Sequence, residues 1–215
     1  MGKTLNITNG DMLNKFLLST NAGEFLPFNE VMMQGIAIND IFSDEFIALR
    51  ADELNTTIDI YKEKMMLIDV LQSTYEDYDE IILWFGQDTF CQMNLLTLLA
   101  FLEQIKYSGM VALNIIDDYS FKIIEENISV SLGIYFDLYN DILVNRSSVL
   151  AKGVITQRAI DLFFDYHSSE GFLATIVKSS PDLDKDLLLE KLIQYSNDYG
   201  ISDIQAKLLI SKYRK

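Results

Sequence analysis

Three short polar segments carry the side chains best suited to chemistry, and each follows an apolar, strand-like run. They are "NGD" (Asn9, Gly10, Asp11), "GQD" (Gly86, Gln87, Asp88) and "DD" (Asp117, Asp118). Carboxylates bind cations or move protons, and the first amides of a helix bind anions. If the strands are parallel, all three segments lie along one edge of a sheet. Glu30 and Gln34, after the second strand, would lie on the same side.

This arrangement predicts a polar pocket in which Asp11, Asp88 and Gln92 orient a small polar ligand, with Trp84 or Phe85 as a wall. Each residue also has a plainer interpretation. Asp11 and Asp88 both stand where a helix would begin, and an N-cap aspartate needs no further function. Gln92 could bond back to the loop, and Trp84 could belong to the core.

The same acids suggest an alternative, a metal-assisted hydrolase or phosphoryl-transfer enzyme that uses Asp11 and Asp88. They lie on separate loops without D-x-D spacing, so we predict no metal site, and the cofactor stays unknown. The sequence has one histidine, His167, and one cysteine, Cys91, which disfavours zinc and a Ser–His–Asp or Cys–His arrangement. We expect His167 to be half-buried on a helix and Cys91 to pack in the core.

Composition limits the partners. The chain has 215 residues, and 32 acidic against 17 basic side chains give a net charge of −15. Such a charge disfavours nucleic acid and anionic membranes as partners. No apolar run is long enough to span a membrane, the amino terminus lacks a signal-peptide core, and a single cysteine excludes an intrachain disulfide. These features together predict a cytoplasmic location.

Hydrophobic patterning predicts the elements that must position these residues. Strands are expected at 3–8, 23–28, 80–85, 110–116 and, more briefly, 121–124; helices at 11–20, 43–54, 56–78 and 88–106; and a loop at 29–40. Alternation of strands and helices predicts an α/β fold of three layers with a mostly parallel, open, Rossmann-like sheet. The segment 88–106 has almost no polar face, so it is either central in the fold or part of a homodimer interface.

Beyond residue 130 the sequence predicts only helices, at 134–146, 154–168, 170–179, 183–197 and 202–213. We therefore expect an α/β domain over 1–130 and a small all-helical domain over 131–215. The last two helices, joined by a turn with Gly200 and Ser202, have a helix–turn–helix outline. Positive charge near the end comes from Lys207, Lys212, Arg214 and Lys215. This suggests a DNA-binding regulator as a further alternative, although cations in a last turn also suit the helix dipole.

Several segments together resemble a bacterial family known as domain of unknown function 1835. They are "NITNGD", "LPFNEVMMQG", "ALRADEL", "IILWFGQDTFCQMNLL" and "LLLEKLIQYSNDYGISDIQAKLL". The family usually has an Asp and a Gly-Pro pair in the loop after the second strand, where this chain has Asn29 or Glu30, and Gly35-Ile36. The resemblance implies ligand-binding positions at Asn9, Gly10, Asp11, Glu30, Arg50, Trp84, Asp88 and Gln92.

Together these observations predict a binding or sensing module for a small polar or phosphorylated ligand at the strand ends. Arg50 would neutralise an anionic group of that ligand. The helical domain would cover the site or relay its occupancy.

Overall fold

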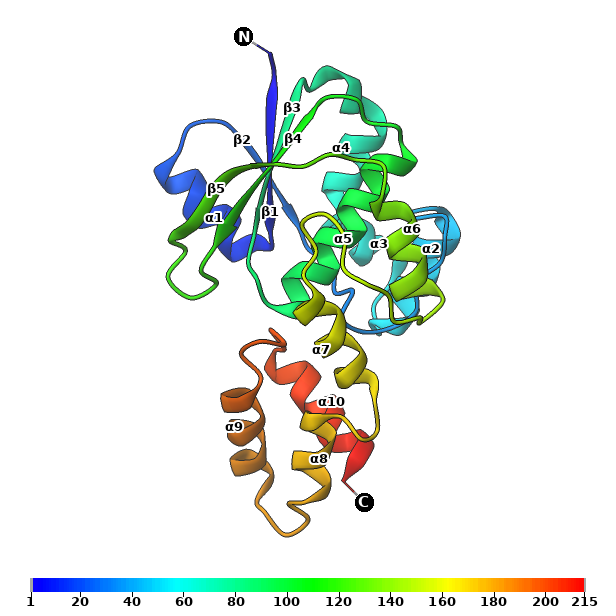
Figure 1. The fold of residues 1–215 in the computed structure, drawn as a ribbon, viewed down its shortest axis with the longest axis vertical. Helices are drawn as coiled ribbons and strands as arrows, with labels where there is room; N and C mark the ends of the chain where they lie inside the picture. The colour runs from blue at the N-terminus through cyan, green and yellow to red at the C-terminus, as the bar shows by residue number, and fades with distance from the viewer. Residues whose placement is uncertain (1, 215) are drawn as a thin grey trace.

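The computed structural model describes residues 2–214, and within them five strands form one sheet (Figure 1). The strands are β1 (Thr4–Asn9), β2 (Glu24–Phe28), β3 (Glu80–Phe85), β4 (Met110–Ile116) and β5 (Ile123–Ser129), in the order β2-β1-β3-β4-β5. The first four are parallel, and β5 pairs antiparallel with β4. The predicted α/β fold with a mostly parallel sheet is confirmed.

Helices cover both faces of the sheet. The chain moves from β1 to β2 in one direction and then back across β1 to β3, so right-handed crossovers place the connecting helices on opposite faces. Helix α1 (Asp11–Thr20) lies on one face. The other face carries α4 and α5 with α2 and α3 beyond them: α2 (Asp44–Glu53), α3 (Ile58–Lys64), α4 (Met66–Thr74) and α5 (Thr89–Gln104).

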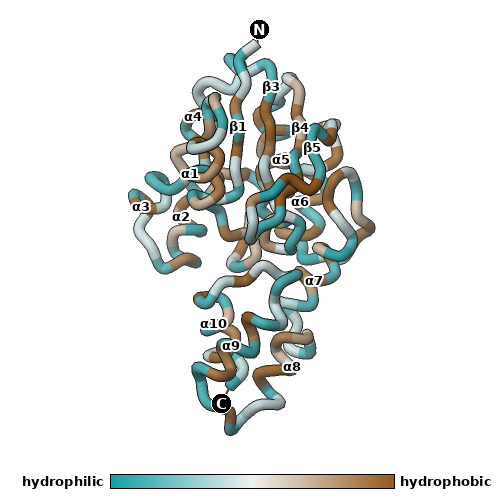
Figure 2. The backbone as a smooth tube through the Cα atoms, turned by 90° about the vertical axis from the view of Figure 1, so that its left-hand side faces the viewer, coloured by the Kyte–Doolittle hydropathy of each residue, from teal (hydrophilic) through white to brown (hydrophobic). Residues whose placement is uncertain are grey.

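Helix α5 is the centre of the main core. Of its 16 residues, 13 are buried, and its apolar side chains pack against residues of the sheet and the surrounding helices. Figure 2 shows strand β3 as hydrophobic along most of its length. Because the chain itself covers α5, the apolar character of this segment no longer argues for a homodimer.

Two predicted elements differ from those observed. The helix expected over 56–78 is interrupted at Met65 (φ −100°, ψ 26°), and a 3-10 turn (Tyr75–Asp77) follows α4. The interruption lets Tyr61 of α3 and Leu71 of α4 both turn into the core, whereas Ile60 stays 45% exposed. Strand β5 is longer than the expected 121–124, because a polar segment is tolerated at an exposed sheet edge.

The helices after β5 separate into two groups. Helix α6 (Tyr135–Tyr139) and the π-helical turn after it (Asn140–Val144) lie beside α5 in the upper body of Figure 1. Below the sheet lie α7 (Gln157–His167), α8 (Phe172–Lys178), α9 (Lys185–Tyr195) and α10 (Asp203–Tyr213). The sequence changes character near residue 130, but the separate helical body begins only at α7. Among the described residues, no helix is both long and apolar enough to cross a membrane.

Candidate functional site

The amino terminus of α5 is the point at which the helical body meets the sheet. Asp88 is the N-cap, and its Oδ1 accepts from the Cys91 amide at 2.7 Å. The amides of Thr89 and Phe90 donate to the carbonyls of Asp198 (2.9 Å) and Tyr199 (3.1 Å). We call the segment 196–200 the docking turn. It occupies the first-turn amides that would otherwise bind an anionic ligand.

Gly200 makes this close approach geometrically feasible. Its φ is +67°, a conformation that residues with a Cβ rarely adopt. A Cβ at this position would also lie 2.3 Å from the Asp88 carboxyl carbon. The glycine that the sequence suggested as a helix–turn–helix turn therefore fits the turn against the α/β body.

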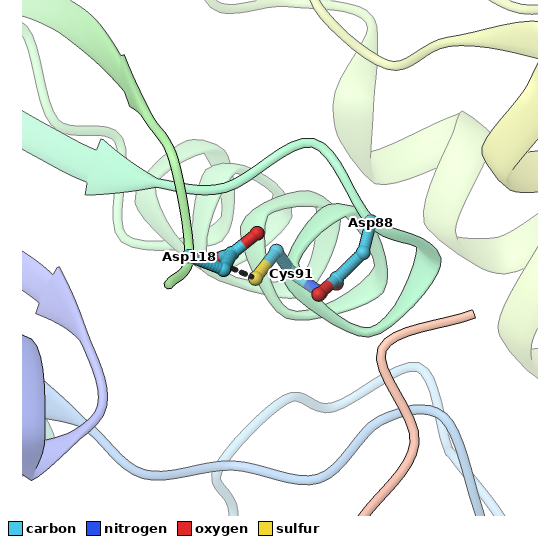
Figure 3. Close-up of side chains that lie close together, drawn as sticks. All are labelled: Asp88, Cys91 and Asp118. Carbon is cyan, nitrogen blue, oxygen red and sulfur yellow. Dashed lines mark hydrogen bonds between the residues drawn. The ribbon is translucent and has the colours of Figure 1, made fainter. Parts of the chain in front are cut away.

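Asp88, Cys91 and Asp118 converge beside this contact (Figure 3). One carboxylate oxygen from each aspartate and the Cys91 sulfur all lie within 4.8 Å of one another. The thiol donates to Asp118 Oδ1 at 3.4 Å. Asp88 belongs to the segment after β3 and Asp118 to the segment after β4, so the predicted edge of parallel strands brings them together. Two carboxylates and a thiol at this separation could hold a divalent cation.

The two aspartates open into a cleft of about 340 Å³ between the sheet edge and the helical body. Four carboxylates contribute to its wall, from Asp88, Asp117, Asp118 and Asp198, against one cation, Arg158, which forms an ion pair with Asp198. We call it the acidic cleft; its other lining residues are Gln87, Thr89, Ile116, Tyr119, Ile124, Ala159 and Asn197. The excess of acids favours a cationic ligand.

The same geometry perturbs the protonation of the cluster. Burial, followed by the charge of Asp88, raises the pKa of Asp118 to about 7. Burial also raises the pKa of Asp88 and, together with both carboxylates, raises the pKa of Cys91 well above its usual value. Asp117, one residue from Asp118, has a lowered pKa because the Ser120 hydroxyl and amide bind its carboxylate. A bound cation would replace the proton that Asp118 retains near neutrality.

The predicted residues of the first strand end are divided between two places. Asn9 reaches the cluster, since its Nδ2 donates to Cys91 Sγ at 2.9 Å and its Oδ1 accepts from Asn94 at 3.0 Å. Gly10, with φ +92°, is the N-cap of α1. Asp11 is therefore the first helical residue rather than the expected cap, and its exposed carboxylate accepts from Asn29 at 3.1 Å. Asp11 lines a different pocket and does not act with Asp88.

Glu30 and Arg50 form a fully buried ion pair instead of a ligand contact, with Nη2 2.7 Å from Oε1. Arg50 also donates to the carbonyls of Val31, Gln34 and Ile36, and the Tyr61 hydroxyl donates to the other oxygen of Glu30. All three guanidinium nitrogens are used within the protein. The expected role of Arg50, neutralising an anionic ligand, is therefore replaced by a structural one: it holds the loop after β2.

Gln92 and Trp84 also have structural partners. Gln92 is buried, and its Oε1 accepts from the amide of Thr156, the N-cap of α7, at 3.0 Å, so it does not bond back to its own loop. Trp84 points to the α1 side of the sheet, where it packs in a small core with Phe25 and donates to Asn6 at 3.0 Å. Neither residue is among those that line the acidic cleft.

Three residues of the cluster and the acidic cleft are not among the site residues predicted from the sequence. Cys91 was assigned to the core, and it is buried, but its sulfur faces two carboxylates. Asp118 was noted at a strand end, and the edge position of "DD" was the signal that could have selected it. Asp198 carried no local signal, because its place depends on the docking turn.

His167 lies on α7 against Phe163, and burial lowers its pKa to about 4.

Comparisons of the chain with protein-family models, with curated proteins and with solved structures found no match.

The buried ion pair generates a stability prediction. Arg50→Met should lower the free energy of unfolding by about 3–5 kcal/mol, because it leaves the Glu30 carboxylate buried without its partner. The exposed pair Lys62–Asp44 supplies the control, and Lys62→Met should cost less than about 1 kcal/mol. Urea denaturation measures both. Equal effects of the two substitutions would show that Arg50 does not hold the loop.

The raised pKa of Asp118 predicts a pH dependence. Between about pH 4 and pH 7 the folded state keeps a proton on Asp118 that the unfolded chain has released, so the contribution of Asp118 to stability falls as pH rises through this window and is constant above it. Asp118→Asn should abolish this fall, gaining on the order of 2 kcal/mol over wild type at pH 7.

Asp117→Asn is the matched control for this measurement. Because the folded pKa of Asp117 is lowered, the substitution should instead lose stability relative to wild type as pH rises through about 4. Urea denaturation of the three proteins across this pH range measures the differences. If Asp118→Asn and wild type have parallel profiles, Asp118 titrates normally and the electrostatic description of the cluster is wrong.

Proposed function

We propose that this protein is a cytoplasmic binding module that holds a divalent cation in the acidic cleft and senses its occupancy through the docking turn. The observation that carries the proposal is the convergence of Asp88, Cys91 and Asp118 within 4.8 Å, where both aspartates also line a cleft between two bodies of the chain. Carboxylate oxygens suit Mg²⁺, Mn²⁺ and Ca²⁺, and a thiol adds affinity for softer ions such as Zn²⁺.

Two features argue against the phosphorylated ligand that the sequence suggested for this edge. The first amides of α5 already donate to the docking turn and to Asp88, and Arg50 is enclosed with Glu30. A phosphate group would also face four carboxylates. A cation, alone or with a small polar molecule bound to it, is the ligand class that suits these charges.

The sensing part of the proposal follows from two residues, Asp88 and Asp198, that take part both in the acidic cleft and in the contact between the docking turn and α5. Asp88 lies in the cation cluster and against Gly200, while Asp198 lines the cleft and caps α5 through its carbonyl. A bound cation would neutralise repulsion among these acids and so strengthen the contact between the sheet edge and the helical body.

One observation favours a second candidate, a metal-assisted hydrolase. An aspartate with a pKa of about 7 beside a second carboxylate is suited to general acid–base catalysis. The pair would be Asp88 and Asp118, not Asp88 and Asp11. Cation-dependent turnover of simple phosphate or carboxylic esters, lost in Asp118→Asn, would favour the enzyme, whereas cation binding without turnover favours sensing.

The DNA-binding alternative has less support. A recognition helix contacts bases with its amino-terminal residues. The first turn of α10, with Ser202 and Gln205, lines a pocket together with Asn29 and Lys64 of the α/β body, so this end of the helix faces its own chain. Lys215, one of the cations that suggested DNA contact, lies outside the described residues.

Thermal shift with Mg²⁺, Mn²⁺, Ca²⁺ and Zn²⁺ tests the proposal. At least one ion should raise the melting temperature saturably, since binding to the folded state alone stabilises it. Asp88→Asn and Asp118→Asn should each weaken binding at least about tenfold, because each removes a charged ligand. Asparagine at position 88 keeps the helix cap, so the effect reports on charge.

Asp11→Asn is the matched control, since Asp11 is an exposed strand-end acid outside the cleft. Its affinity should equal that of wild type. Cys91→Ser should weaken Zn²⁺ and leave Mg²⁺ unchanged. The proposal fails if no ion stabilises the wild type, or if Asp118→Asn and Asp11→Asn behave alike.

A further inference from the structure

The helical body has a second concave site, at the end farthest from the sheet, where α9 begins and α10 ends (Figure 1). It measures about 570 Å³, within the usual size of small-molecule sites. We call it the basic groove; it is lined by Lys185, Asp186, Leu189, Lys207, Ile210, Ser211 and Arg214. Three cations and one acid surround a floor of two aliphatic side chains.

The charge of the groove contrasts with that of the rest of the chain. Residues 1–130 contain 21 acidic and 7 basic side chains, whereas residues 131–215 contain 11 and 10. Within the described residues, Lys185, Lys207 and Arg214 form no ion pair with any carboxylate. Three like charges sharing one groove repel each other, and an anion between them would relieve that repulsion.

The cations of the groove differ in how they can act on a ligand. Nη2 of Arg214 donates to the carbonyls of Pro181 (2.9 Å) and Leu183 (2.5 Å), and its Nη1 is buried, so Arg214 contributes positive charge to the wall of the groove. Lys185 stands in the first turn of α9, where the helix dipole disfavours a cation.

We infer that the basic groove binds a small phosphate ester, with Lys185 and Lys207 at the phosphate and the charge of Arg214 in the wall beside them. Leu189 and Ile210 would lie against an apolar part of the ligand. The Ser211 hydroxyl supplies a further donor. The concave shape favours a small molecule over a DNA duplex, which would require a protruding helix. This inference is independent of the cation site, because the two sites share no lining residue.

Isothermal titration with phenyl phosphate and with inorganic pyrophosphate tests the inference on the full chain. Phenyl phosphate should bind with a Kd below about 1 mM, more tightly than pyrophosphate, because it also covers the apolar floor. Lys185→Ala and Lys207→Ala should each weaken binding about fivefold and the double variant about twentyfold or more. Phenol, which lacks the phosphate, should not bind detectably.

Lys152→Ala, which removes an exposed lysine outside the groove, is the charge-matched control and should bind as wild type does. Circular dichroism melting checks that each variant is folded. Wild-type affinity in the double variant, or no binding by the wild type, overturns the inference. A short DNA duplex that binds through these lysines more tightly than phenyl phosphate would overturn it in favour of a nucleic-acid surface.

Discussion

The contact between the docking turn and the first turn of α5 is the constraint on which the rest of the arrangement depends. Carbonyls of Asp198 and Tyr199 satisfy two amides of α5, and Asp88 satisfies a third. The anion site that the amino terminus of α5 would offer is therefore filled by groups of the protein itself. The same contact also contributes to the acidic cleft, because the turn brings Asp198 to a wall that Asp118 also lines.

The distribution of buried charge explains why the α/β body can be so acidic at this edge. Its one fully buried cation, Arg50, is already committed to Glu30 and to three loop carbonyls. Arg158, the cation of the cleft, is paired with Asp198. Burial raises the pKa of both Asp88 and Asp118; the charge of Asp198 adds to this at Asp88, and the charge of Asp88 adds to it at Asp118. Without a local counter-ion, this arrangement favours either a proton or a metal ion at the cluster.

Local signals in the sequence were sufficient for most of the fold and for part of the site. Short apolar runs that end at polar or glycine residues predict the parallel strands. The position of Asp88 directly before a long apolar segment predicts that it caps a helix. Interactions between distant segments were not predictable in this way. Gln92 bonds to Thr156 across 64 positions, and the Thr89 hydroxyl bonds to the Asp198 carbonyl across 109. Arg50 likewise carries no sign in the sequence that its partner is Glu30 rather than a ligand.

The position of a bound ion tests the central claim most directly. Crystals of the protein soaked with Mn²⁺ should give an anomalous difference peak within about 2.5 Å of carboxylate oxygens of both Asp88 and Asp118. The docking turn should stay in contact with α5 in the same crystals. A peak that contacts neither aspartate, or an empty cleft at a Mn²⁺ concentration that stabilises the protein in solution, would contradict the account.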